Sequence, residues 1–258
     1  MESMQFVDTH CHVHFSDYEL DADEVLLEAV QNGVTKIICV GCTLADSIAA
    51  VELAERKSEV WAAIGLHPHE GARYVDDHTA LQRFRGLASK PKVVAVGETG
   101  LDYYYNHAPK EDQKKLLQFQ LDVAVEHGLP LIFHVREAFR DFWEVLDGYS
   151  GVRGVVHSFS AAKKELDEVL SRGLFVGLNG IMTFTKNDAQ LEAAREVPLD
   201  RLILETDAPF LTPVPFRGKI CQPKHVVETA KFLAKLRGES LVALAEQTTR
   251  NATNLFGL

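Results

Sequence analysis

The chain has 258 residues, of which 46% are hydrophobic, so it is long enough for one large domain with a sizeable core and is not expected to be disordered. Its formal net charge of −10 argues against a broad basic surface for duplex nucleic acid, although a phosphate substrate handled locally by metal ions and a few Arg or Lys stays open. No apolar run approaches the ~20 residues that span a bilayer, and the N-terminus lacks the layout of a signal peptide. We therefore expect a cytoplasmic protein that does not engage a membrane.

Short apolar runs alternate with segments of helical period along the chain. Eight runs are typical of strands, at residues 5–9, 35–40, 60–64, 92–96, 130–133, 152–156, 174–178 and 201–204. Amphipathic stretches predict helices at 22–32, 44–56, 79–88, 110–127, 139–146, 162–172, 188–196, 223–236 and 239–256. This order predicts an α/β fold, a single (β/α)8 TIM-type barrel over residues 1–258. An open doubly wound sheet is the competing topology, but no Gly-rich dinucleotide loop follows the first strand.

Two cysteines, Cys39 and Cys42, form a C-x-x-C pair that invites a zinc or redox interpretation. No second pair follows, and these residues come at the end of an apolar, β-branched run. We therefore expect buried reduced thiols rather than a zinc site, which agrees with a cytoplasmic location.

The first strand is expected to end on two histidines, His10 and His12. Residues two apart in extended backbone project from the same face, so both imidazoles point into one space. Because active sites of (β/α)8 barrels lie at the carboxyl ends of the strands, the ends of the other strands should complete the site. Ligand-type residues do stand there: Glu98, His134, His157 and Asp207.

Four histidines and two carboxylates in these places can hold two divalent ions, and the donor types suit zinc, manganese or magnesium. A carboxylate such as Glu98 can bridge two ions about 3.5–4 Å apart, and such a pair clamps an in-line displacement and lowers the pKa of bound water. Asp207 can ligate one ion and accept the proton of that water, although a turn-forming role is the alternative. We therefore predict Glu98 and Asp207 as catalytic residues.

Substrate contacts are predicted on the loops that follow the strands. His67 follows the third strand, and Arg136 comes two residues after His134, where it can contact a phosphate or form a surface ion pair. Tyr103, with the two tyrosines after it, can stack on a base or pack at the rim. Arg217 and Lys219 are further candidates for phosphate contacts. Glu205 can support Asp207 without binding the metal ions itself.

Six ordered motifs together resemble the TatD family of metal-dependent deoxyribonucleases, which belongs to the amidohydrolase superfamily of barrels. They are Asp8-Thr9-His10-Cys11-His12, Gly65-Leu66-His67-Pro68, Gly97-Glu98-Thr99-Gly100-Leu101-Asp102-Tyr103, His134-Val135-Arg136, His157-Ser158-Phe159-Ser160 and Leu204-Glu205-Thr206-Asp207-Ala208-Pro209. The resemblance spans the chain and implies metal ligands at His10, His12, Glu98, His134, His157 and Asp207. It also implies hydrolysis of DNA phosphodiester bonds, as a 3′–5′ exonuclease supported by Mg²⁺ or another divalent ion.

One departure from the family pattern concerns the loop after Asp207. Cys221 and Gln222 stand where many members have Asn and Glu, which puts substrate preference in doubt but not metal binding. A metal-dependent amidase or lactonase of the same superfamily is the alternative function; many of those enzymes place a carboxylated lysine on strand four, where this chain has Glu98. A barrel that has lost catalysis would lack a ligand, and none is missing. The acidic charge predicts a preference for single-stranded DNA or frayed 3′ ends. We expect the protein to be a monomer.

Overall fold

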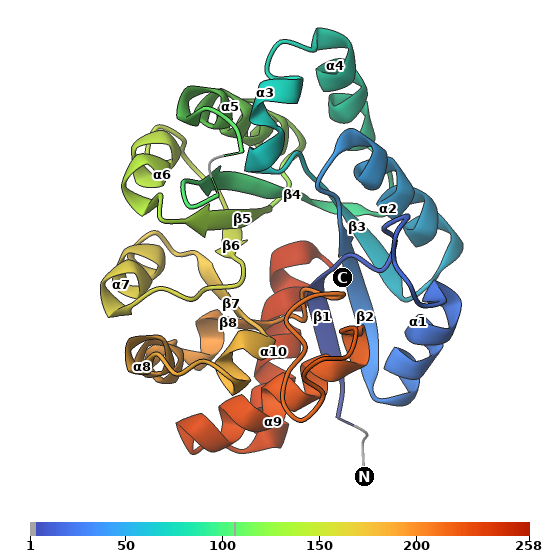
Figure 1. Cartoon of the computed structure of the whole chain (residues 1–258), viewed down its shortest axis with the longest axis vertical. Coiled ribbons are helices and arrows are strands. Elements are labelled where there is room, and N and C mark those ends of the chain that lie inside the picture. Colours follow the sequence, from blue (N-terminus) through green and yellow to red (C-terminus); the bar gives the residue numbers. More distant parts are fainter. Residues whose placement is uncertain (1–3, 106) are drawn as a thin grey trace. The chain divides into compact units, whose positions relative to one another are not determined.

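The computed structural model describes residues 4–105 and 107–258 (Figure 1). These residues form two compact units. The first, here the terminal unit, comprises Met1–Cys39 and His157–Leu258. The second, here the central unit, is Val40–Val156. Among the helices of the described residues, none is both long and apolar enough to cross a membrane.

The terminal unit brings the first and last strands of the chain together. Its strands are β1 (Phe6–Cys11), β2 (Val34–Val40, of which the last residue belongs to the central unit), β7 (Phe175–Leu178) and β8 (Leu202–Leu204). β1 pairs in parallel with β2, and β7 with β8. A parallel bridge between Cys11 and Ala208 joins the end of β1 to the segment after β8. First and last strands side by side are expected for a closed barrel and not for an open doubly wound sheet.

Amphipathic helices cover the strands of the terminal unit (Figure 1). They are α1 (Ala22–Gln31), α7 (Lys163–Ser171), α8 (Asp188–Glu196), α9 (Val226–Arg237) and α10 (Leu241–Phe256), with short 3-10 turns at Gly180–Thr183, Leu199–Arg201 and Pro223–His225. The side chain of Asp21 accepts a hydrogen bond of 3.0 Å from Glu24 N and so caps α1. α10 packs on β1, β8 and α9, which ties the end of the chain to its beginning.

The central unit is a run of four parallel strands in sequence order. They are β3 (Val60–Ile64), β4 (Val93–Asp102), β5 (Leu131–Arg136) and β6 (Gly154–Val156). The helices are α2 (Leu44–Arg56), α3 (Gly71–Tyr74), α4 (His78–Leu87), α5 (Lys110–His127) and α6 (Phe139–Leu146), with a 3-10 turn at Pro68–Glu70. α2 packs on β3, α5 on β4 and α6 on β5, as strand–helix–strand units require.

Three strands continue further than the sequence pattern predicts. β1 runs through Cys11, β4 through Asp102 and β5 through Arg136, so that His10, Glu98 and His134 lie within strands instead of beyond them. The apolar pattern stops early because the last residues of these strands are polar. They nevertheless hydrogen-bond to their neighbours as strand residues do, since Gly100 pairs with His134.

Candidate metal site

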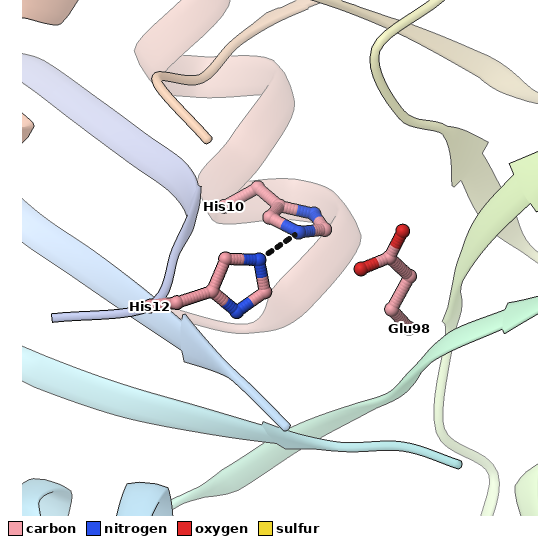
Figure 2. Close-up of side chains that lie close together, drawn as sticks. All are labelled: His10, His12 and Glu98. Carbon is pink, nitrogen blue, oxygen red and sulfur yellow. Dashed lines mark hydrogen bonds between the residues drawn. The ribbon is translucent and has the colours of Figure 1, made fainter. Parts of the chain in front are cut away.

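The terminal unit places His10 and His12 side by side. His10 lies in β1 and His12 directly after it, and both side chains are buried. Their Nε2 atoms are 3.1 Å apart, a contact drawn in Figure 2. The i and i+2 spacing therefore does bring two imidazole nitrogens to one point, as the sequence predicts.

Asp207 lies against both of these histidines. Its Oδ1 is 3.5 Å from His10 Nε2 and 3.3 Å from His12 Nε2. The backbone holds it there, because Asp207 N donates to His10 O at 2.8 Å and His12 N donates to Ala208 O at 2.6 Å. Burial opposes ionisation of Asp207, but the hydrogen bond to His12 and the nearby imidazoles outweigh it and lower the pKa of Asp207. The carboxylate is therefore charged at neutral pH.

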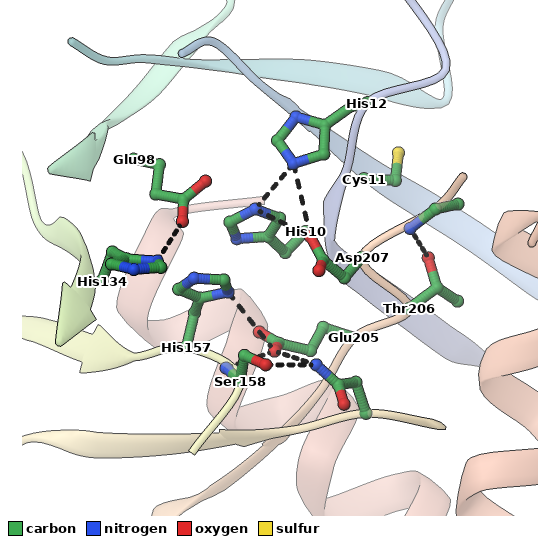
Figure 3. A network of polar contacts seen from close by, with 12 residues as sticks. His10, Cys11, His12, Glu98, His134, His157, Ser158, Glu205, Thr206 and Asp207 are labelled. Atoms are coloured by element: carbon green, nitrogen blue, oxygen red, sulfur yellow. Dashed lines mark hydrogen bonds and ion pairs between the residues drawn. The ribbon is translucent and has the colours of Figure 1, made fainter. Parts of the chain in front are cut away.

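His157 and Glu205 extend this group (Figure 3). The ring of His157 stacks on that of His10 with centroids 4.1 Å apart, and its Nδ1 lies 3.6 Å from Glu205 Oε1. The same Oε1 accepts hydrogen bonds from Ser158 N at 2.6 Å and Asn179 Nδ2 at 3.2 Å. Ligand atoms of His10, His157 and Glu205 lie within 4.8 Å of one another. We call His10, His12, His157, Glu205 and Asp207 the terminal cluster.

The carboxylate of Glu205 indicates which kind of group the terminal cluster fits. Glu205 is fully buried, and its Oε2 has no hydrogen-bond partner among the described residues. A buried, uncompensated carboxylate oxygen is costly, and a cation beside imidazole nitrogens would compensate it. A Cβ on Gly177 would lie 2.5 Å from this oxygen, so a glycine is needed there. The terminal cluster therefore fits a divalent metal ion.

A buried carboxyl group, Asp8, supports the terminal cluster from within β1. Its Oδ1 accepts hydrogen bonds from Thr206 N at 2.9 Å and from His10 N at 3.3 Å, and its Oδ2 accepts one from Thr206 Oγ1 at 2.6 Å. Burial raises the pKa of Asp8 to about 8, although these hydrogen bonds act in the opposite direction. Asp8 thereby fixes the segment before Asp207 against β1.

The central unit contains a second group of ligand-type side chains, which we call the central cluster. Glu98 Oε1 is 2.7 Å from His134 Nδ1, a pair drawn in Figure 3, and 3.6 Å from His67 Nε2. Ligand atoms of His67, Glu98 and His134 lie within 4.8 Å of one another. Gly65, directly after β3, allows the backbone to come close to Glu98, because a Cβ on Gly65 would lie 2.1 Å from Glu98 N. The central cluster therefore also has the donor set of a divalent metal site.

Asp102, at the end of β4, orients two histidines and a loop. Its Oδ2 is 3.0 Å from His134 Nε2 and 3.1 Å from His69 Nε2. Its Oδ1 accepts hydrogen bonds from Tyr104 N at 3.0 Å and Tyr105 N at 3.1 Å. Burial opposes ionisation, but these partners outweigh it and hold the pKa of Asp102 well below its usual range. Asp102 stands in the third motif of the sequence, but that motif does not indicate this role.

The two cysteines of the C-x-x-C pair have separate environments. Cys39 is buried, with its Sγ 3.9 Å from Cys11 Sγ, and both are free thiols. Cys42 is half-buried, and its thiol donates to Glu98 Oε2 at 3.7 Å. Cys39 therefore lies beside Cys11 in the terminal unit, and Cys42 supports the central cluster through Glu98.

The predicted substrate residues lie at exposed or half-exposed positions. Arg136 is exposed, and its guanidinium carbon lies over the rings of Tyr104 and Tyr105. The hydroxyl of Tyr103, by contrast, donates to Asp141 Oδ2 at 2.9 Å. Arg217 lies over the ring of Phe184 and donates to Thr212 O at 2.8 Å.

The two residues that depart from the family pattern have structural partners. Cys221 is buried, its N donates to Pro209 O at 3.0 Å, and its O accepts a hydrogen bond from the Tyr18 hydroxyl at 3.4 Å. Gln222 N donates to His225 Nδ1 at 3.1 Å and so begins the turn that leads into α9. These residues fix the loop after β8 in place.

Both clusters consist of imidazoles and carboxylates that lie in the strands of an α/β fold or shortly after the strands end, which is the make-up of a metal-dependent hydrolase. The family model of the TatD related DNases matches residues 7–257, and the chain belongs to that family. A metal-dependent hydrolase, YabD of Bacillus subtilis, is 36% identical over 96% of this chain and 98% of its own length. The 3′-5′ ssDNA/RNA exonuclease TatD of Pectobacterium carotovorum is 33% identical over 94% and 96%.

The fold class is confirmed by a solved structure. The crystal structure of YjjV, a TatD homologue from Escherichia coli, matches 99% of both chains with a TM-score of 0.90 and 30% identity. The chain is thus a (β/α)8 barrel of the TIM type and an enzyme of the TatD hydrolase family, and the open doubly wound alternative is wrong.

Proposed function

We propose that this enzyme hydrolyses phosphodiester bonds of DNA from the 3′ end, with divalent metal ions as cofactors. The observation that carries the proposal is that each unit contains its own group of imidazoles and carboxylate: His10, His157 and Glu205 are buried, and His67 and His134 are half-buried around the buried Glu98. Membership of the TatD family supports the reaction class, and the exonuclease names of relatives support the substrate.

We propose six metal ligands: His10, His12, Glu98, His134, His157 and Asp207. The proximity of Asp207 to His10 and His12, and of Glu98 to His134, supports this set. Two divalent ions, Mg²⁺ in the first place and Zn²⁺ or Mn²⁺ as alternatives, would lower the pKa of a bound water and neutralise charge on the phosphate. Glu205, with its unsatisfied Oε2, is an additional candidate that the six-residue set leaves out.

We assign proton transfer to Asp207. Its pKa is lowered by His12 and His10, so the carboxylate is ionised at neutral pH and can accept a proton from the attacking water. The backbone hydrogen bond from Asp207 N to His10 O keeps the carboxylate beside the histidines during proton transfer. Glu98 acts as a ligand whose position Cys42 and His134 fix.

Substrate binding is assigned to His67, Arg136, Tyr103 and Arg217. Arg136 supports this assignment best, since it is exposed and comes from the same strand as His134. We propose single strands or frayed 3′ ends as the preferred DNA, because a chain of net charge −10 cannot neutralise many phosphates of a long duplex. The reduced thiols support a cytoplasmic location. Both clusters lie in one chain, which supports action as a monomer.

An amidase or lactonase function receives less support. Enzymes of that kind in this superfamily often use a carboxylated lysine on strand four, whereas β4 holds Glu98 and has no lysine between Val93 and Asp102. This carboxylate is engaged by His134 and Cys42.

The function is tested with end-labelled oligonucleotides and purified enzyme that has been stripped of metal and then reloaded with Mg²⁺, Mn²⁺ or Zn²⁺. We expect release of nucleotides from the 3′ end of single-stranded DNA in the presence of metal, and slower release from blunt duplex. The rate on RNA of the same sequence shows whether the enzyme prefers deoxyribose or ribose in its substrate. Turnover of a lactone or a dipeptide without cleavage of any oligonucleotide would contradict the proposal.

A further inference from the structure

Two exposed tyrosine rings lie beside the central cluster. Tyr104 is 53% exposed and Tyr105 is 50% exposed, although large aromatic side chains are normally well buried. Their rings stand edge to face, with centroids 4.9 Å apart. The guanidinium carbon of Arg136 lies 4.2 Å from the centroid of Tyr104 and 4.7 Å from that of Tyr105. One cation thus joins both rings at the surface.

The backbone that carries these rings is held by the same carboxylate that contacts His134. Asp102 Oδ1 accepts hydrogen bonds from the backbone amides of Tyr104 and Tyr105, while Oδ2 contacts His134 and His69. The ring of His69 lies near both groups, with its centroid 6.4 Å from that of His134 and 5.7 Å from that of Tyr105. The backbone of Tyr104 and Tyr105 is therefore fixed relative to the ligand histidine.

Tyr103 differs from the two tyrosines that follow it. Its hydroxyl is bound to Asp141, and the ammonium group of Lys110 lies 4.0 Å from its ring centroid. Its ring is half-buried. Tyr103 thus also fastens the loop, and its ring is less open to solvent than those of Tyr104 and Tyr105.

We propose that Tyr104, Tyr105 and Arg136 form a stacking platform for an unpaired nucleobase of single-stranded nucleic acid. The inference rests on the proposed function and names the part of the substrate that this surface binds. An exposed aromatic face accepts any base, because every base has a π-face, and a guanidinium can stack on a base or bind its phosphate. Bases in a duplex are already stacked on one another, so the platform selects single strands and unpaired ends.

The test measures binding without catalysis, by fluorescence anisotropy of labelled octamers with metal-free protein in EDTA. The two probes are an oligothymidine and an octamer of abasic residues, which carries the same phosphates. We expect the wild type to bind the oligothymidine about tenfold more tightly or better. The variant Y104L/Y105L should lose this preference, and Y104F/Y105F, which retains both rings, should keep it. R136Q should weaken binding of both probes.

Equal affinity of the wild type for the two probes, or an undiminished preference in Y104L/Y105L, would overturn the platform. Should the double leucine variant fail to fold, as judged by circular dichroism, Y104L and Y105L are compared singly with their Phe counterparts. Cleavage by the metal-loaded wild type is measured separately. Tighter binding of the oligothymidine without any cleavage would contradict the nuclease function and support the platform. Cleavage with equal binding of the two probes would support the nuclease function and contradict the platform.

Discussion

Asp102 Oδ2 lies 3.0 Å from Nε2 of His134, while Nδ1 of the same imidazole faces Glu98. A neutral imidazole carries one proton, and His134 has a carboxylate at each nitrogen. A metal ion at Nδ1 would need the lone pair there and the proton on Nε2, where the buried carboxylate of Asp102 can accept it. Asp102 therefore favours the tautomer in which His134 can act as a ligand.

Replacement of Asp102 by Asn should lower metal affinity about 10- to 100-fold, because an amide N–H facing Nε2 favours the tautomer protonated on Nδ1. Metal affinity is measured by isothermal titration with Mn²⁺. Asp122→Asn is a matched control, since Asp122 binds only the Tyr149 hydroxyl on the surface of the same unit in the contacts described here. Equal affinities of the D102N variant and the wild type would show that Asp102 does not orient the ligand.

Replacement of Asp207 by Asn should abolish hydrolysis, with a loss of at least about 10²- to 10⁴-fold, because an amide cannot accept the proton of the attacking water. Asn is the suitable substitute here because Asp207 has a positive φ of 62°, which Asn tolerates better than most residues. Rates on single-stranded DNA are compared with thermal unfolding of the same samples. A normal rate would remove Asp207 from the role of proton acceptor.

Binding of single-stranded DNA should depend only weakly on salt. Arg136, Arg217 and Lys219 are the cations expected to contact phosphates. Three such contacts predict a slope of about −2 when the logarithm of the association constant is plotted against the logarithm of the salt concentration. The slope is measured with an oligonucleotide in EDTA between low and moderate NaCl. A slope steeper than about −5 would indicate a wide basic surface that the composition does not predict.

His225 should make the folded state less stable in acid. It is buried, its Nδ1 accepts the Gln222 N–H, and burial lowers its pKa from 6.5 to about 4. As the pH falls, the unfolded chain therefore binds a proton at His225 before the folded chain does. The contribution of neutral His225 to the free energy of unfolding is complete above pH 6.5 and declines as the pH falls towards 4. This decline lowers the free energy of unfolding by up to about 3 kcal/mol. Urea unfolding of wild type and H225Q at pH 7 and pH 4.5 measures it; an identical pH dependence of both would contradict the assignment.

The helices could be predicted from sequence almost to the residue, because their amphipathic period is regular; α2, α5, α6 and α8 begin and end where expected. Three strands, β1, β4 and β5, were predicted to end too early, because their last residues include the polar ones that carry the site. The supporting roles of Asp8 and Asp102 could not be predicted, since these depend on which carboxylate faces which histidine. Glu205 was predicted to support Asp207, but its contact with His157 could not be predicted. The motif Gly-Leu-Asp-Tyr at 100–103 was the only signal for Asp102.

The central claim is that each unit supplies ligands for a divalent ion, and counting bound Mn²⁺ by electron paramagnetic resonance tests it most directly. We predict two ions per wild-type chain. H157A, in the terminal cluster, and H134A, in the central cluster, should each bind about one ion fewer. A wild type that binds no ion, or a full complement retained in both variants, would contradict the claim.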